Sequence, residues 1–70
     1  MTAAEYRAAI KALGYRAEHA YHFRSQDHSI ALYLPPPVGE ARLWGDTEVE
    51  AWALAYQYAL DRHWATALDL

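Results

Sequence analysis

The side chains with the most obvious chemical potential are four histidines, at positions 19, 22, 28 and 63. Imidazole is a common metal ligand and general acid–base, so the spacing of these residues decides whether they can act together. His19 and His22 are three residues apart in a segment that alternates like a strand, which puts them on opposite faces. We expect His28 in a turn, and His63 packed beside Trp64 on a helix rather than catalytic.

The sequence offers no other catalytic signature. It has no cysteine, no glycine-rich phosphate loop and no nucleophile elbow around a serine. No pair of carboxylates stands at helical spacing beside a histidine. We therefore expect no catalytic residue, no metal and no cofactor, and predict a binding protein rather than an enzyme.

Length and composition restrict the class of protein further. Seventy residues with a formal net charge of −3 predict a single domain over residues 1–70. We expect no membrane segment, because no apolar run approaches the ~20 residues that span a bilayer. The sequence also lacks a basic stretch followed by an apolar one, so we expect no signal peptide. The lack of cysteine favours a cytoplasmic location.

The first element that must position side chains is a helix over residues 3–13. Thr2 and Glu5 have the spacing of a capping box, in which each side chain bonds the backbone of the other residue. Gly14 stands where a left-handed residue commonly ends a helix.

The middle of the chain alternates with a period of two, which predicts strands. We expect strands over Tyr15–Arg24 and Ser29–Leu34, and a third, less strongly marked one over Glu40–Trp44. The polar stretch Ser25–His28 predicts a turn, so the first two strands pair antiparallel. Pro35-Pro36-Pro37 is expected to end the second strand.

A second helix is predicted from Thr47 to about residue 66, with Thr47 and Glu50 repeating the capping spacing. Its bulkiest apolar residues define the expected core face, and Ala51 falls on the opposite side. The expected core face comprises Val49, Trp52, Ala53, Tyr56, Leu60, His63, Trp64 and Ala67, and it should meet Ile10, Leu13, Ile30 and Leu32. The resulting fold class is α+β: a small two-layer sandwich in the order helix, strand, strand, strand, helix, with both helices on one face of an antiparallel sheet.

One candidate binding surface lies on the outward side of the second helix. Residues 36–70 carry six carboxylates against two arginines, so this half of the chain is acidic. The outward side combines an apolar pair with flanking acids, a pattern that fits a basic protein partner. These residues are Glu48, Glu50, Leu54, Tyr58 and Asp61. The alternative is that a second copy buries this side in a homodimer.

A second candidate surface is the open face of the sheet. Basic side chains interleaved with aromatic ones can stack bases and contact phosphates of single-stranded nucleic acid. The residues expected there are Arg16, His22, Arg24, Tyr33 and Arg42, with Glu18 and Trp44 beside them. Because the chain as a whole is acidic, nucleic-acid contact is the alternative rather than the first expectation.

Two stretches resemble known families. The order of elements, with Ser25-Gln26-Asp27-His28-Ser29 in place of a Gly-Ser-His-His type stretch, resembles the HicA-type toxins, which are small ribonucleases. That resemblance implies a double-stranded-RNA-binding-like fold and a catalytic role for His28. Separately, Met1–Gly14 is similar to the opening helix of small helix-turn-helix regulators from phages and high-GC bacteria.

Taken together, these features predict a small acidic protein-binding module. The class that fits best is a phage or mobile-element inhibitor of the anti-CRISPR kind, which would cover a basic nucleic-acid-binding surface of a host complex. The alternative is a nucleic-acid-binding or HicA-like ribonuclease domain that uses the open sheet face.

Overall fold

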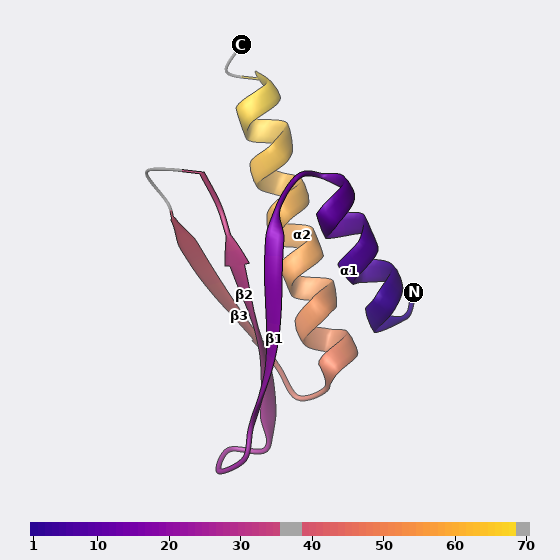
Figure 1. The fold of residues 1–70 in the computed structure, drawn as a ribbon, viewed down its shortest axis with the longest axis vertical. Helices are drawn as coiled ribbons and strands as arrows, with labels where there is room; N and C mark the ends of the chain where they lie inside the picture. The colour runs from indigo at the N-terminus through magenta and orange to yellow at the C-terminus, as the bar shows by residue number, and fades with distance from the viewer. Residues whose placement is uncertain (36–38, 69–70) are drawn as a thin grey trace.

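The computed structural model describes residues 1–35 and 39–68, with side chains up to residue 65. The elements follow in the order α1, β1, β2, β3, α2, which confirms the predicted order (Figure 1). Their bounds are Ala3–Ala12 for α1, Arg16–His22 for β1, Asp27–Tyr33 for β2, Glu40–Gly45 for β3 and Glu48–Leu68 for α2.

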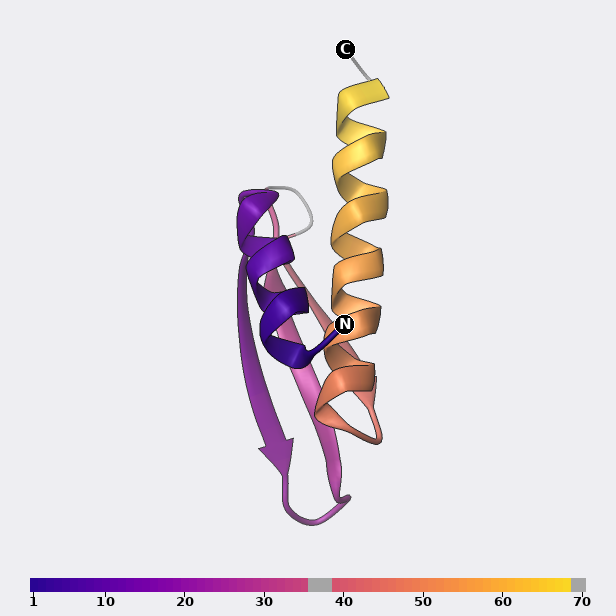
Figure 2. The same ribbon diagram turned by 90° about the vertical axis from the view of Figure 1, so that its right-hand side faces the viewer.

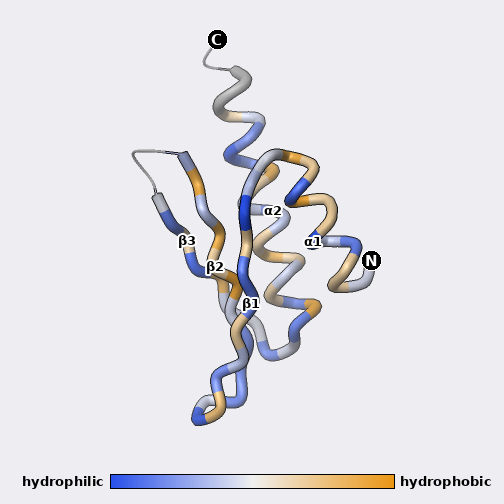
Figure 3. The backbone as a smooth tube through the Cα atoms, in the orientation of Figure 1, coloured by the Kyte–Doolittle hydropathy of each residue, from blue (hydrophilic) through white to orange (hydrophobic). Residues whose placement is uncertain are grey.

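The three strands form one antiparallel sheet in which β2 lies between β1 and β3. Both helices cover one face of this sheet, so the molecule is the expected two-layer α+β sandwich (Figure 2). The register places Ile30 opposite His19 on β1 and opposite Leu43 on β3. Figure 3 shows orange, hydrophobic segments along β2 and blue, hydrophilic ones along β1 and β3, as expected for a central strand between two edge strands.

Helix α1 begins and ends as the sequence predicts. The Glu5 N–H donates to Thr2 Oγ1 at 3.2 Å, and the Thr2 N–H donates to Glu5 Oε1 at 3.0 Å, which completes the capping box. The hydrogen bond from the Thr2 backbone, followed by that from the Thr2 side chain, lowers the pKa of the Glu5 carboxyl. Gly14 follows the helix with φ +93°, a conformation that glycine adopts without steric cost.

The hairpin between β1 and β2 differs from the prediction in its bounds. The turn covers residues 23–26, and β2 begins at Asp27 rather than at Ser29. Gln26 takes a positive φ of 58°, which lets the chain reverse early. His28 is therefore a strand residue, and its predicted place in a turn is wrong. Pro36 and Pro37 lie outside the described residues, and β2 ends at Tyr33.

The core is built on small residues of α2 rather than on its bulkiest ones. Three alanines one turn apart, Ala51, Ala55 and Ala59, are fully buried against the sheet. Ala51 was expected to face outward, so that assignment is wrong. Trp52 is also buried, beside Ile10, Ile30 and Leu32, as predicted. The helix is thus turned so that its alanines face the sheet and the large side chains flank them.

The close approach of α2 to the sheet begins where β3 ends. A Cβ atom at Gly45 would lie 2.6 Å from the backbone nitrogen of Ala51. No side chain fits in that space, so Gly45 allows the first turn of α2 to rest directly on the end of β3. On the other side, Tyr56 meets Tyr6 of α1, with ring centroids 5.7 Å apart.

Several residues of the expected core face of α2 lie outside the core. Val49 is 44% exposed and Trp64 is 60% exposed, while Leu60 is half-buried and His63 is exposed. The cause for Trp64 is visible in Figure 1, where the last turns of α2 run beyond the end of the sheet. The side chain of Ala67 lies outside the described part of the chain.

The two tryptophans of α2 provide a matched test of this packing. Trp52→Ala should cost about 3–5 kcal/mol, because it empties a fully enclosed site in a core of few residues. Trp64→Ala should change the free energy of unfolding by less than about 0.5 kcal/mol, since its ring lies largely in solvent. Urea denaturation of both variants measures the difference. Equal losses of stability would show that the end of α2 is packed against something in the folded chain.

Candidate binding surfaces

The outward residues of α2 occupy different environments. Glu50 and Leu54 line a shallow groove together with Trp44, Gly45, Asp46 and Ala53, at the edge of the sheet formed by β3. This set is called the α2–β3 groove below. Leu54 is 50% exposed and Trp44 is 47% exposed, so two large apolar side chains meet solvent there. The sequence pattern located Glu50 and Leu54, but Trp44 and Asp46 enter the groove only through the folded contact between β3 and α2.

The loop from β3 into α2 fixes one wall of this groove. The Glu50 N–H donates to Thr47 Oγ1 at 3.1 Å, as the capping spacing predicts. The Glu50 carboxylate, however, accepts from the Asp46 N–H at 3.1 Å rather than from Thr47. The Glu50 carboxylate is consequently held against the backbone of Asp46, so the two acidic residues lie next to each other in the lining of the groove. Among the described residues that line it, none is a lysine or arginine.

Three other members of the predicted surface have local partners. Glu48 Oε1 lies 3.4 Å from His19 Nδ1, so this acid faces the sheet rather than a partner. Asp61 is exposed and accepts a hydrogen bond from Gln57 at 3.1 Å. Tyr58 was expected to point outward with Leu54, but it is half-buried and packs against the core. Its hydroxyl also accepts from Arg62 Nη2 at 3.3 Å, which makes Tyr58 part of the support of α2.

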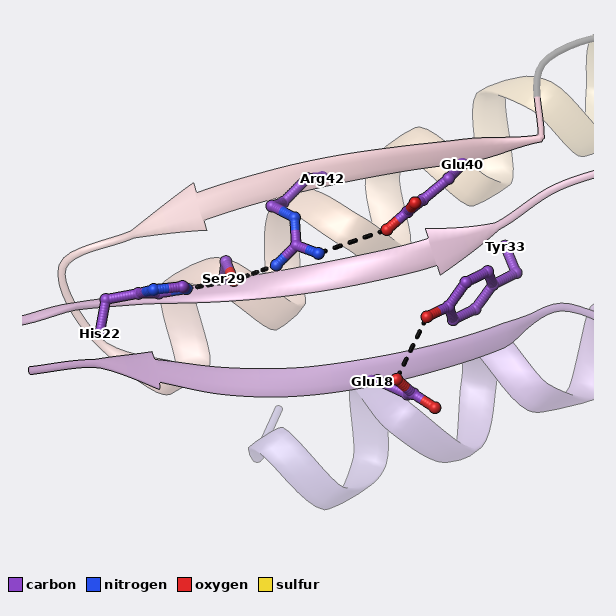
Figure 4. Close-up of polar contacts among 6 residues, drawn as sticks. All are labelled: Glu18, His22, Ser29, Tyr33, Glu40 and Arg42. Atoms are coloured by element: carbon purple, nitrogen blue, oxygen red, sulfur yellow. Dashed lines mark hydrogen bonds and ion pairs between the residues drawn. The ribbon is translucent and has the colours of Figure 1, made fainter.

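The second predicted surface, the open face of the sheet, brings most of its expected residues together (Figure 4). Arg16, His22, Tyr33 and Arg42 lie there on three strands. Arg24 does not, because it lies in the turn after β1. At the centre is Ser29, which is fully buried although it faces away from the helices.

Ser29 is buried because larger side chains from both neighbouring strands close over it. His22 Nε2 lies 2.7 Å from Ser29 Oγ, and Arg42 Nη1 donates to the same oxygen at 3.2 Å. The ring of His22 also contacts that of Trp44, with centroids 4.6 Å apart. These contacts join β1, β2 and β3 across the face, as Figure 4 shows for His22, Ser29 and Arg42.

The cations of the open face are paired with carboxylates of the same face. Arg42 Nη2 lies 3.3 Å from Glu40 Oε1, and Arg16 Nη2 lies 4.0 Å from Glu18 Oε1. Tyr33 donates its hydroxyl to Glu18 Oε2 at 3.1 Å. Phosphates of a nucleic acid would have to compete with these carboxylates for both arginines. The arginines of this face are therefore already engaged by carboxylates of the same face.

A third cluster, formed by His19, His28 and Glu48 on the helix side of the sheet, was not predicted from the sequence. His19 Nε2 lies 2.9 Å from His28 Nδ1, and their rings stack with centroids 5.1 Å apart. Together with Glu48 they form a chain from β2 through β1 to the first turn of α2. The alternation of the strand could have predicted it. His28 and Ile30 are two residues apart, so they lie on the same face of the sheet once β2 begins at Asp27.

This histidine cluster has a structural explanation. Within the described residues, no group of three or more His, Cys, Asp or Glu side chains is arranged to hold a metal ion. The cluster links the hairpin to α2, and His22 points to the opposite face of the sheet, as predicted.

The described part of the chain also contains no helix that is both long and apolar enough to cross a membrane.

Comparison of the chain with protein-family models, with curated proteins and with solved structures finds no match. The HicA-like interpretation consequently stays a prediction. His28 does lie on a strand, as that resemblance requires, and its imidazole is bonded to His19.

The bond between Tyr33 and Glu18 makes a testable prediction for the open face. This hydrogen bond and the negative charge of Glu18 raise the pKa of the Tyr33 hydroxyl above its ordinary value of 10.0. Because the pKa is raised in the folded chain, the bond stabilises the fold at neutral pH. The stabilisation is lost as the pH rises through the raised value.

Glu18→Gln should therefore bring the pKa of Tyr33 down toward its ordinary value, as measured by NMR titration of tyrosine ring carbons. Glu40→Gln is the matched control, because Glu40 acts on Tyr33 only through its charge and with a smaller effect. An unchanged Tyr33 titration in Glu18→Gln would show that the two side chains are not bonded in solution.

Proposed function

We propose that this chain is a protein-binding module that uses the α2–β3 groove to hold a basic partner. The observation that carries the proposal is that Trp44 and Leu54, each about half exposed, line one groove together with the acidic residues Asp46 and Glu50. Tryptophan is strongly enriched among residues that dominate binding energy, and arginine is enriched on the surfaces that meet them. A partner that presents an apolar side chain next to a lysine or arginine fits this groove.

The charge distribution supports a basic partner in particular. The groove carries two acids, and Asp61 adds a third exposed carboxylate further along α2. Complementary charge accelerates association and selects among partners, while the apolar contact holds the complex together. The open face offers less, because its arginines are already paired.

The kind of activity that follows is steric inhibition rather than catalysis. Basic surfaces of host proteins commonly bind nucleic acid, and an acidic module seated on such a surface would displace it. The proposal therefore keeps the inhibitor class expected from the sequence, that of phage or mobile-element proteins such as anti-CRISPR proteins. The partner would then be a cytoplasmic protein or complex.

A capture experiment with matched variants tests this function. The immobilised chain is incubated with host lysate in parallel with Leu54→Ala and Val49→Ala, which both shorten an exposed apolar side chain of α2. We expect a protein that is retained by the wild type and by Val49→Ala, because Val49 lies outside the groove. Leu54→Ala should weaken the purified complex about tenfold, as expected for a side chain at the centre of an interface.

Charge gives the second arm of the test. Asp46→Asn should slow association and reduce its salt dependence, since the carboxylate of Asp46 steers a basic partner. Melting curves serve as the control for folding. The proposal is wrong if Leu54→Ala binds the purified partner as tightly as the wild type does. It is also wrong if the chain retards labelled RNA or single-stranded DNA and substitution of Arg16 and Arg42 abolishes that binding.

A further inference from the structure

A second concave site lies at the opposite edge of the sheet, between α1 and β1. Its lining includes three cations, Arg7, Lys11 and Arg16, and we refer to it as the α1–β1 cleft. Arg7 and Lys11 are four residues apart on α1, so both side chains leave the helix on the same side. Arg16 is the first residue of β1 and approaches from the other wall. In a chain with a net charge of −3, this concentration of positive charge is local.

Two of the three cleft cations, Arg7 and Lys11, lack the carboxylate partners that the arginines of the open face have among the described residues. Arg16 belongs to both surfaces and keeps its long contact with Glu18. The Arg7 guanidinium lies over the ring of Trp52, 5.9 Å from its centroid, which orients it without removing its charge. Glu18 is the one acid of the lining, and it accepts the Tyr33 hydroxyl while Arg16 lies 4.0 Å from it.

The end of α1 opposes this positive charge less than an uncapped helix end would. A helix C-terminus carries unpaired carbonyls that repel anions. Here the carbonyls of Ala9, Ile10 and Lys11 accept bonds from the N–H groups of residues 13–15. Three of the last four carbonyls of α1 are thus bonded within the chain, which reduces the repulsion that an anion between Lys11 and Arg16 would meet.

The floor of the cleft is apolar. Ile10 is buried beneath it, and Ala17 and Tyr15 are half-buried side chains of the lining. A site with an apolar floor and convergent cations suits a ligand with an organic body and a compact, multiply charged anionic group. Phosphate fits that group best, because arginine binds it with two parallel hydrogen bonds and lysine adds a point charge.

We propose that the α1–β1 cleft binds a small phosphate-bearing ligand, with Arg7, Lys11 and Arg16 as the phosphate-binding residues. This inference is independent of the groove at the β3 edge, because the two sites share no residue. Loss of one activity would leave the other intact.

The test is an NMR titration of the amide signals at near-physiological salt with three probes: ADP, inorganic pyrophosphate and adenosine. We expect ADP and pyrophosphate to shift the signals of residues 7–17, and adenosine to leave them in place. Tighter binding of ADP than of pyrophosphate would identify an organic phosphate as the ligand type. Equal binding would identify inorganic phosphate chemistry alone.

Variants distinguish a built site from general charge attraction. Lys11→Gln should weaken ADP binding about tenfold, the loss expected for one charge-assisted contact. Arg24→Gln is the matched control, since it removes the same charge from the exposed turn far along the hairpin. The inference is overturned if ADP leaves the cleft signals unchanged, or if Arg24→Gln weakens binding as much as Lys11→Gln. Preferential binding of an acidic peptide over ADP would overturn it as well.

Discussion

The close contact between α2 and the sheet is the constraint on which the rest of this structure depends. It requires that Gly45, Ala51, Ala55 and Ala59 lack bulk along one line, from the end of β3 up the buried side of the helix. With the backbone so near the strands, the larger side chains of α2 are displaced to the two flanks. Trp52 and Tyr56 then fill the space under and beside α1, while Leu54 is left at the β3 edge.

This arrangement gives the molecule two chemically different edges. At the β3 edge, the Gly45–Thr47 connection brings carboxylates next to exposed apolar surface. At the β1 edge, α1 contributes cations above an apolar floor. The open face between them is closed by its own network, in which a buried serine is covered by a histidine and an arginine. A small domain can thus separate surfaces of opposite charge without any of them disturbing its core.

Local signals in the sequence predicted the elements well, because each depends on residues close together in the chain. The Thr2–Glu5 capping box, the alternation of β1 and the opposite orientation of His19 and His22 are of this kind. The orientation of α2 was not predictable in the same way. Alanine is only weakly hydrophobic, so a pattern that weights bulky residues chose Val49 and Trp64 over Ala51. The sequence does not reveal that close packing favours the smallest side chains at this contact.

The candidate binding surfaces show the same difference between features that follow from local spacing and features that depend on tertiary contacts. Glu50 and Leu54 share a helix face and were found from their spacing, whereas Trp44 joins them through tertiary structure. Tyr58 was assigned outward because a helix wheel cannot show how far the sheet extends beneath it. His28 was placed in the turn because residues 25–28 are all polar, whereas the observed turn lies two residues earlier, with Gln26 in a left-handed conformation.

The strand order β1-β2-β3 also has a kinetic consequence, because every pair of neighbouring strands is consecutive in the chain. Each hairpin closes a short loop, which lowers the relative contact order and with it the entropic barrier to folding. The contact between α1 and α2 joins opposite ends of the chain and closes the longest loop. The meander is consequently suited to form early, with docking of the two helices on its apolar face completing the native state.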